Sequence, residues 1–435
     1  MIVLQKTKKT FPETYPQAIL SKYTLSVPCN NGWIFYNTRS GSVIWSNKQS
    51  LNSEDVVLRR NGFVIPENYD ETQFARDEFI FAASHSDTLE LTLQTTLDCT
   101  CRCVYCYQGG DKPANCFMGE NELNFLKSWI VSKLKDYKKL HINWFGGEPL
   151  LNYSAILNFS AQMIRICAKS GCVYYSGVVT NGILLTPQLI QQLIKDAWVR
   201  SFTITLDGPH EIHDQRRIKK NGGGTFDDIC RSIDNLLLSP DAHIMLRIQI
   251  DRENLKYMPE LFSFIQQKKW FLSPNIKLTF VRTKSRTSAC TFSDESVLDQ
   301  CSWGNVDEIL FDLCRKYSIP RQNALPKSPS GGCQNKHFYV FNPKGDIFPC
   351  HALASGTPMT KEEEDLWKSW LPWENNPDCA ECVLFPLCQG GCPFNTLHES
   401  DALVAELPCP DWRFSLEQHL CRWGKNKLEK GEFFT

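Results

Sequence analysis

The chain has 435 residues, of which 42% are hydrophobic and 22% charged, and its formal net charge is −1. This balance suits a globular protein with a sizeable core. The absence of any block of lysine and arginine argues against nucleic acid or an anionic membrane as the main partner. No apolar run in the sequence approaches the ~20 residues that span a bilayer, and the N-terminus lacks the features of a signal peptide. We therefore expect a cytoplasmic protein, where 20 cysteines indicate metal binding rather than disulfides.

Residues 1–85 predict a small separate module. Residues 23–28 and 32–37 have the composition of strands, and the sequence Asn30-Asn31-Gly32 between them is typical of a turn. Residues 53–62 favour a short helix with Ser53 as its N-cap.

Residues 86–285 alternate between strand-like and helix-like segments, and this alternation predicts a parallel sheet with right-handed crossovers. The fold class is therefore α/β, as a partial (β/α)6 barrel similar to a TIM barrel. Ligands of such sheets bind at the carboxyl ends of the strands. The expected strands are residues 89–94, 140–144, 174–180, 201–206, 244–250 and 277–281, and the expected helices are residues 120–135, 153–169, 186–195, 226–238 and 257–268.

The remainder of the chain loses this alternation. Residues 286–330 predict a connector that contains a helix near residues 306–317. Residues 331–435 are rich in Cys, Pro and Gly and poor in periodic pattern. Such a segment could hardly fold by hydrophobic burial alone, so we expect bound metal to supply the missing stability.

Three cysteines follow the first expected strand of the barrel, in the spacing Cys99-x3-Cys103-x2-Cys106. Three thiolates in one loop are able to ligate three irons of a 4Fe–4S cube and to leave the fourth iron open. A structural zinc loop is the alternative, but it requires a fourth ligand that the nearby sequence lacks. Cys101 lies inside the loop but does not fit the spacing, and we expect it to be a bystander.

Further motifs follow the next three expected strands. Phe145-Gly146-Gly147-Glu148-Pro149 follows the second strand, Thr180-Asn181-Gly182 the third, and Thr205-Leu-Asp207-Gly-Pro the fourth, with His213-Asp214 and Arg217 shortly after. Taken alone, Asp207-Gly-Pro is also compatible with a simple turn and His213-Asp214 with a helix cap.

Together these motifs resemble the radical S-adenosylmethionine (SAM) superfamily. The resemblance implies a 4Fe–4S cluster on Cys99, Cys103 and Cys106 whose open iron chelates SAM. In one branch of the superfamily an arginine after the fourth strand helps to hold SAM; Arg217 fits that position better, and Arg216 is its rival. Arg247 and Asn254 are further candidates for SAM binding. The implied SAM contacts are Tyr105, Gly146, Gly147, Glu148, Thr180, Asn181, Thr205, Asp207 and Arg217.

The tail carries a second cysteine pattern, Cys333-x11-Gly345-x4-Cys350, then Cys379-x2-Cys382-x5-Cys388-x3-Cys392, then Cys409. This order resembles the SPASM domain, an extension of radical SAM enzymes that mostly modify peptides. The spacing alone also suits a pair of zinc sites. The resemblance implies two auxiliary 4Fe–4S clusters, an outer one on Cys379, Cys382, Cys388 and Cys409 and an inner one on Cys333, Cys350 and Cys392.

The fourth ligand of the inner cluster stays open at this point. Some members of the family carry a cysteine at the position of Lys327, which leaves Cys290, Cys301, Cys314 or an open iron in this chain. The remaining cysteines are expected to be small buried apolar residues: Cys29, Cys116, Cys167, Cys172, Cys230 and Cys421.

The resemblance implies an oxidoreductase that uses a 5′-deoxyadenosyl radical to abstract hydrogen from a ribosomally made precursor peptide, with auxiliary clusters accepting an electron. A carbon–carbon, ether or thioether crosslink would result, as in maturases of cyclophane and darobactin-type peptides. The expected partners are the peptide, bound by the N-terminal module through β-addition, and an electron donor of the flavodoxin or ferredoxin type.

Two alternatives remain. Sulfatase maturases, which form formylglycine, resemble the tail but usually have Asp after the cysteine of G-x4-C, where this chain has His351. His351 is a candidate for a substrate-side base, a cluster ligand or a packed loop residue. A non-catalytic iron–sulfur electron carrier is the alternative from another class, and the intact SAM motifs argue against it.

Overall fold

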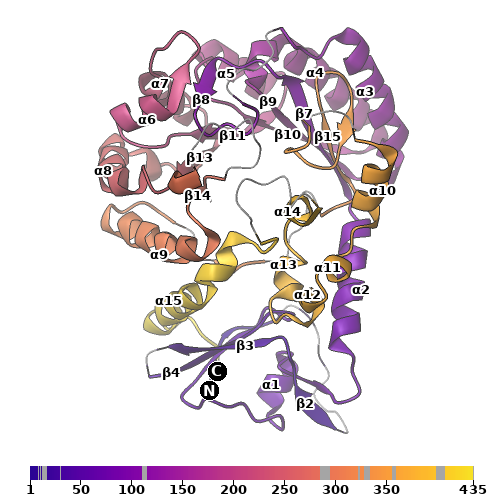
Figure 1. Ribbon diagram of the computed structural model, residues 1–435, viewed down its shortest axis with the longest axis vertical. Coiled ribbons are helices and arrows are strands. Elements are labelled where there is room, and N and C mark those ends of the chain that lie inside the picture. Colours follow the sequence, from indigo (N-terminus) through magenta and orange to yellow (C-terminus); the bar gives the residue numbers. More distant parts are fainter. Residues whose placement is uncertain are drawn as a thin grey trace.

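The computed structural model of the chain describes residues 1–7, 9, 11, 17–29, 31–109, 115–284, 294–321, 324–327, 334–354, 359–397 and 407–434. Its main element is an eight-stranded sheet with the order β14-β13-β11-β10-β9-β7-β15-β16 (Figure 1). Within the described residues, no helix combines the length and the apolar character that crossing a bilayer requires.

Six parallel strands form most of this sheet, and the sequence predicted all six. Strand follows helix along the chain, so each crossover helix covers the outer face of the sheet. The strands are β7 (Thr88–Thr96), β9 (Lys139–Gly146), β10 (Val173–Val179), β11 (Val199–Thr205), β13 (His243–Ile250) and β14 (Ile276–Arg282). The five predicted helices are also present, as α3 (Glu120–Lys133), α4 (Tyr153–Ser170), α5 (Pro187–Lys195), α7 (Phe226–Leu237) and α8 (Met258–Lys268).

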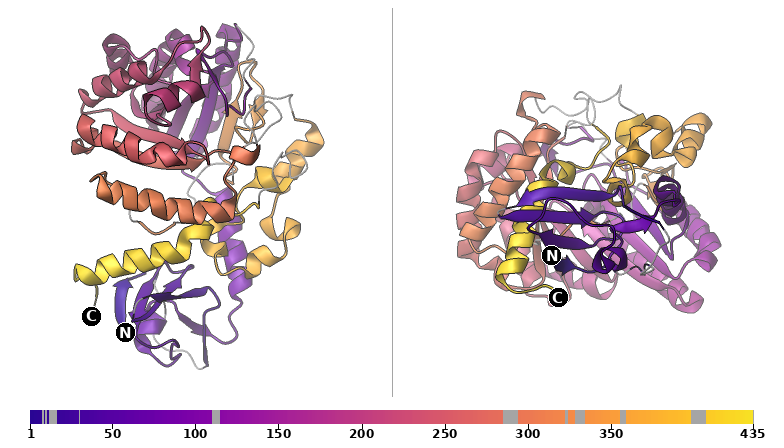
Figure 2. Two further views of the ribbon diagram at one scale, coloured as in Figure 1. Left: turned by 60° about the vertical axis from the view of Figure 1, so that its left-hand side comes forward. Right: turned by 90° about the horizontal axis from the view of Figure 1, so that it is seen from below.

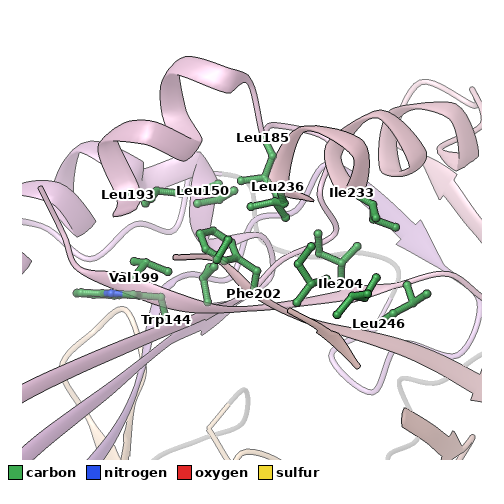
Figure 3. Close-up of a cluster of buried hydrophobic side chains, with 14 of the residues drawn as sticks. Trp144, Leu150, Leu185, Leu193, Val199, Phe202, Ile204, Ile233, Leu236 and Leu246 are labelled. Atoms are coloured by element: carbon green, nitrogen blue, oxygen red, sulfur yellow. The ribbon is translucent and has the colours of Figure 1, made fainter. Parts of the chain in front are cut away.

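The core lies between the strands and these helices. Alternate residues of each strand point outward, so Trp144, Phe202 and Leu246 pack against helix residues such as Ile233 and Leu236 (Figure 3). Local sequence fixes where the helices start. For example, the Thr186 hydroxyl accepts a hydrogen bond from the backbone N–H of Leu189 at the start of α5.

The barrel is partial, because β14 and β7 are not neighbours in the sheet. Two short strands from the tail continue the sheet beyond β7 instead. β15 (Phe338–Phe341) is parallel to β7, and β16 (Ile347–Phe348) is antiparallel to β15. Neither strand was predicted, since both lie in the region with weak periodicity.

The N-terminal module is built on a four-stranded sheet with the order β1-β5-β4-β3. The predicted hairpin is confirmed as β3 (Thr24–Cys29) and β4 (Gly32–Asn37). The predicted helix is α1 (Val56–Arg60), but its cap is Asp55 rather than Ser53, because the Asp55 carboxylate accepts from the Val57 N–H at 2.8 Å. The other elements are β1 (Ile2–Gln5), β2 (Ala18–Leu20), β5 (Val43–Ser46), β6 (Val64–Pro66) and the unpredicted α2 (Glu71–Ser84).

This module shares a hydrophobic core with the other end of the chain. Ile34 and Val27 of its sheet lie in one buried cluster with Leu420 and Trp423 of α15 (Leu416–Glu429). Figure 2 shows α15 between the N-terminal sheet and α9 (Gln300–Lys316). The sequence-based expectation of a separate module did not anticipate this joint core.

The connector helix α9 begins earlier than the predicted residue 306. The described tail then forms short helices, and it buries more apolar surface than its composition suggested, including Trp367, Trp370, Phe385 and Phe394. These helices are α10 (Lys361–Ser369), α11 (Pro372–Asn375), α12 (Asp378–Glu381), α13 (Phe385–Cys388) and α14 (Pro393–Leu397), followed by the 3-10 helix η7 (Asp411–Ser415).

Candidate functional site

A pocket of about 300 Å³ lies at the carboxyl ends of the parallel strands. It brings together motifs that follow four different strands, as the sequence predicted. Two predicted residues, Glu148 and Asp207, are fully buried beside it rather than in its lining. The predicted residues that line it are Cys99, Cys103, Cys106, Tyr105, Gly146, Gly147, Thr180, Asn181, Thr205 and Arg217.

The cysteine loop is held by a small antiparallel ribbon that the sequence did not reveal. Strand β8 (Cys101–Cys103) pairs with β12 (Arg217–Lys219), so that Cys103 lies opposite Arg217. The main chain extends this pairing at both ends, because Val104 N–H donates to Arg216 O at 3.1 Å and Lys220 N–H donates to Thr100 O at 2.9 Å. The pairing therefore fixes the positions of the cysteines relative to the predicted SAM-binding arginine.

Gly146 and Gly147 allow the end of β9 to lie directly against the start of the cysteine loop. A Cβ on Gly146 would stand 2.2 Å from Thr96 O, and one on Gly147 would stand 2.1 Å from Asp98 O. The close approach is used for hydrogen bonds, since Gly147 N–H donates to Thr96 O at 2.9 Å. Packing of β9 against the cysteine loop therefore requires glycine at both positions, in addition to their predicted role in SAM binding.

Glu148 connects this segment to the end of β10. Its Oε1 accepts from the Thr180 hydroxyl at 2.7 Å, and its Oε2 accepts from the Asn181 N–H at 2.7 Å. Burial, together with the negative charge of the nearby Cys99, raises the pKa of Glu148 to about 7. The carboxyl group therefore positions Thr180 and Asn181 from behind the pocket lining.

Asn181 in turn contacts the cysteine loop. Its Nδ2 donates to the Thr100 hydroxyl at 2.7 Å and lies 3.8 Å from Cys99 Sγ. Amide donors near a thiolate stabilise its negative charge. The segment predicted to contact SAM thus also contacts a predicted cluster ligand.

Tyr105 belongs to a buried network of charged groups. Its hydroxyl donates to the Asp207 carboxylate and accepts from Arg217 Nη1 at 2.6 Å. Burial raises the pKa of Tyr105 well above its ordinary value, so the phenol stays protonated. Arg217 lines the pocket, whereas Arg216 forms a buried ion pair with Asp251. The geometry favours Arg217 over its rival as a group that faces a ligand.

Three residues near this network have structural partners. His213 Nδ1 accepts from the Asp207 N–H at 3.1 Å, and burial lowers the pKa of the His213 ring, which keeps it neutral. Asp214 accepts from Thr225 N–H and Phe226 N–H and so caps α7, as the structural alternative stated. Asn254 Nδ2 donates to Asp207 O at 2.8 Å.

Arg247 is the other candidate beyond the main motifs. It lines the pocket from β13, and its Nε has no hydrogen-bond partner among the described residues. Asn254, by contrast, does not line the pocket. Of these two candidates, only Arg247 is placed to meet a ligand.

The donor set of the loop suits iron, because soft thiolates are the preferred protein ligands of iron–sulfur clusters. Cys103 and Cys106 are partly exposed, while Cys99 is buried at the pocket wall. Hydrogen bonds with Cys103 and Cys99, together with burial, hold the pKa of Cys101 well above its usual range. A thiol that resists ionisation fits the prediction that Cys101 is a bystander.

The four predicted ligands of the outer cluster lie together in the tail. Burial and the neighbouring thiols of Cys382, Cys409 and Cys379 raise the pKa of Cys388 to about 12. Arg413 Nη1 donates to Cys409 Sγ at 3.1 Å and so supplies positive charge beside this group. Across the described residues, no three histidine, cysteine or acidic side chains are close enough to hold a single metal ion.

The predicted inner set is less complete. Cys350 and Cys392 lie in the same apolar cluster, whereas Cys333 and the alternative ligand Cys290 fall outside the described residues. Of the other two alternatives, Cys314 is buried in the barrel core and Cys301 is exposed on α9. Neither of these two lies in the cluster that contains Cys350 and Cys392.

His351 packs at the edge of the pocket. Its ring centroid lies 5.4 Å from that of Phe145, which lines the pocket, and 5.3 Å from that of Phe338 on β15. His351 does not line the pocket itself and reaches it through the Phe145 ring, so its role toward the substrate stays a prediction.

Comparisons with known proteins show what the chain is similar to. Residues 93–265 match the radical SAM superfamily. The PqqA peptide cyclase of Rhodopseudomonas palustris is 22% identical over 70% of this chain and 81% of its own. A serine-type anaerobic sulfatase-maturating enzyme of Klebsiella aerogenes is 29% identical over 68% and 77%. The mycofactocin maturase MftC of Mycobacterium tuberculosis is 22% identical over 69% and 77%.

Two solved structures share the fold. Native anSMEcpe with bound AdoMet covers 79% of this chain and 99% of its own, with a TM-score of 0.55 and 15% identity. Streptococcus suis SuiB bound to the precursor peptide SuiA covers 90% of this chain and 100% of its own, with a TM-score of 0.51 and 15% identity.

Proposed function

This chain carries a radical SAM domain, and from that premise we propose that it forms an oxidative crosslink in a ribosomally made precursor peptide. The observation that carries the proposal is the pocket at the strand ends, where three cysteines meet the glycine motif of β9 and Arg217. A protein that only carries electrons does not need a SAM-binding pocket beside its cysteines. The maturases among the relatives support a peptide as the substrate.

Cys99, Cys103 and Cys106 would hold the 4Fe–4S cluster. When bound, the cluster and SAM supply a 5′-deoxyadenosyl radical that abstracts hydrogen from an unactivated carbon. Tyr105, Arg217 and Arg247 line the proposed SAM site, and the positive charges of the two arginines suit a carboxylate. Thr180, Asn181 and Thr205 add polar groups to the same lining, with Thr205 paired to Arg247 across β11 and β13.

In the tail, we assign Cys379, Cys382, Cys388 and Cys409 to an outer auxiliary cluster. Cys350 and Cys392, with Cys333, are assigned to an inner one. Their place in the proposal is to accept the electron that the substrate loses. An electron donor of the flavodoxin or ferredoxin type and a cytoplasmic location complete the proposal, because such proteins and exposed thiols belong to a reducing compartment.

His351 is proposed as the group that takes up the proton which the substrate loses with that electron. The proposal is supported by its place between Phe145 and Phe338 at the edge of the pocket. A neutral imidazole accepts a proton near physiological pH. Its expected phenotype is specific: His351→Ala lowers crosslink formation more than SAM cleavage.

We propose that the N-terminal sheet binds the leader part of the precursor. Of its two outer strands, β1 is bridged at Val3 by Phe434, which occupies that edge. β3 is the other outer strand of the described sheet and is the edge available for β-addition.

Mass spectrometry tests the proposal. A peptide encoded by a short open reading frame beside the gene is co-expressed with this chain under conditions that supply iron and sulfide. We expect the loss of two hydrogen atoms per crosslinked site, and fragmentation locates the joined residues. The control with Cys99, Cys103 and Cys106 all changed to Ala leaves the peptide unchanged.

The second candidate function is formylglycine formation, which the similarity to the sulfatase-maturating enzyme of Klebsiella aerogenes favours. An unmodified precursor together with SAM cleavage would point to it. In that case a peptide with the modification site of a sulfatase becomes the substrate to test.

A further inference from the structure

Gln94 of β7 is fully buried, yet both polar atoms of its carboxamide lack a hydrogen-bond partner in the part of the chain that the structure describes. The next two residues differ, because the hydroxyls of Thr95 and Thr96 donate to Pro149 O and Cys116 O. Another buried amide, that of Gln300, has partners for both polar atoms: it donates to Leu407 O and Cys409 O and accepts from Leu407 N–H. Since buried polar groups almost always have partners, an exception of this kind calls for an explanation.

The side chain of Gln94 faces the inside of the barrel. Leu89, Leu91 and Leu93 of the same strand lie in the core between the sheet and the helices. Because side chains alternate between the two faces of a strand, Gln94 belongs to the opposite, inner face. The same argument places Phe145 on that face, since Trp144 packs in the core.

Gln94 and Phe145 are direct neighbours across β7 and β9. Side chains in such pairs on one face are in contact range. The Phe145 ring lines the pocket that contains the three cysteines, and its centroid lies 5.4 Å from that of His351. Gln94 does not line that pocket itself, and its link to the pocket is its pairing with Phe145 across the two strands.

A carboxamide offers hydrogen-bond donors and an acceptor side by side. The group that matches both at once in a peptide substrate is a main-chain amide, which presents one N–H and one C=O. We propose that the inner face of the barrel carries a subsite in which Gln94 binds a main-chain amide of the precursor peptide. This subsite rests on the proposed function and adds to it a residue that positions the peptide beside Phe145.

The test compares Gln94→Leu with Gln300→Leu, because both substitutions remove the same carboxamide group. With the neighbouring-gene peptide as probe, Gln94→Leu is expected to raise the peptide KM by roughly tenfold to a hundredfold. It also raises the amount of 5′-deoxyadenosine formed per modified peptide, because a badly placed peptide lets the radical react unproductively. Gln94→Asn, which keeps the carboxamide, restores part of the loss.

Thermal unfolding separates this role from a structural one. Gln94→Leu is expected to keep or raise the melting temperature, because it removes two unpartnered atoms, whereas Gln300→Leu lowers it by breaking three hydrogen bonds. An unchanged KM and coupling in Gln94→Leu would overturn the subsite while the crosslinking function stands. So would a lower melting temperature with equal losses of SAM cleavage and modification, as expected if Gln94 only holds buried water. A wild-type chain that modifies no precursor would overturn the peptide function and the subsite together.

Discussion

The two cysteine-rich regions of this chain are organised in opposite ways. The barrel loop is held by the chain itself, through the β8–β12 ribbon, the close contact at Gly147 and the hydrogen bond from Asn181. In the tail, Cys379, Cys382 and Cys388 sit on or beside α12 and α13, which have four residues each. Helices of that length are not stable by themselves. The comparison indicates that the chain's own contacts preform the barrel loop, whereas we expect the tail to depend on bound metal for its local order.

The largest effect on stability and SAM cleavage is expected from Gly147→Ala, which disturbs the contact that holds the cysteine loop in place. The added Cβ would stand 2.1 Å from Asp98 O, so the cysteine loop must move. We expect a loss of about 3 kcal/mol in stability and little remaining SAM cleavage, measured as 5′-deoxyadenosine by liquid chromatography.

Gly171→Ala is the matched control for this change. Gly171 ends α4 with a φ of +68° and has no atom within 4 Å of an added Cβ. It should cost about 1 kcal/mol from backbone conformation alone and keep SAM cleavage. Equal behaviour of the two variants would show that the contact with the cysteine loop does not matter.

A smaller effect, and one that depends on pH, is expected from Glu148→Gln. The two carboxyl oxygens of Glu148 accept hydrogen bonds from the backbone N–H groups of Asn181 and Leu150. In Glu148→Gln an amide NH2 group replaces one of these oxygens and faces an N–H donor without an acceptor. We expect a loss of about 1–3 kcal/mol near pH 5, measured by thermal unfolding of both proteins.

The sign of the pH dependence follows from the raised pKa. The folded pKa of Glu148 is about 7, above the value of about 4.5 that is usual for a glutamate, so between these values the folded chain holds a proton that the unfolded chain has released. This contribution is complete below about pH 4.5 and is lost as the pH rises through about 7. The advantage of the wild type over Glu148→Gln should therefore shrink between pH 5 and pH 8. A growing advantage would contradict the raised pKa.

The sequence predicted the barrel well because each strand and helix there carries its own periodic signal, as in the alternating Leu89, Leu91 and Leu93. It did not predict β8 and β12, which are three residues long and pair segments more than a hundred residues apart. The sequence predicted which residues belong to the site, but not which of them face the pocket. Arg217 lines the pocket and Arg216 does not, and this difference depends on the long-range pairing of β8 with β12.

The tail was predicted less well for a related reason. Its strand β15 joins the barrel only by pairing with β7, and α15 is stabilised by the N-terminal sheet. Neither partner is near in sequence, so local patterns carry little information about these elements. The resemblance to the SPASM domain implied the group of Cys379, Cys382, Cys388 and Cys409. Burial and the charges of the other three thiols raise the pKa of Cys388, so the four lie near one another, and their shared cluster stays a prediction.

The smallest effect is expected from Arg413→Ala in the tail. The guanidinium lies 3.1 Å from Cys409 Sγ and 3.9 Å from Cys382 Sγ, but it is exposed, so solvent weakens the interaction. We expect iron to leave the outer site only a few times faster in the presence of a chelator. Arg315→Ala, an exposed arginine on α9, is the control and should show no change.

Electron paramagnetic resonance of the reduced, anaerobically reconstituted protein tests the central claim most directly. The account predicts that adding SAM changes the signal of one reduced 4Fe–4S cluster, because an open iron in the barrel loop binds it. Changing Cys99, Cys103 and Cys106 to Ala should abolish that response and leave the signals of the tail clusters in place. A spectrum that does not respond to SAM, or a response that survives in the triple variant, would contradict the assignment of the barrel pocket.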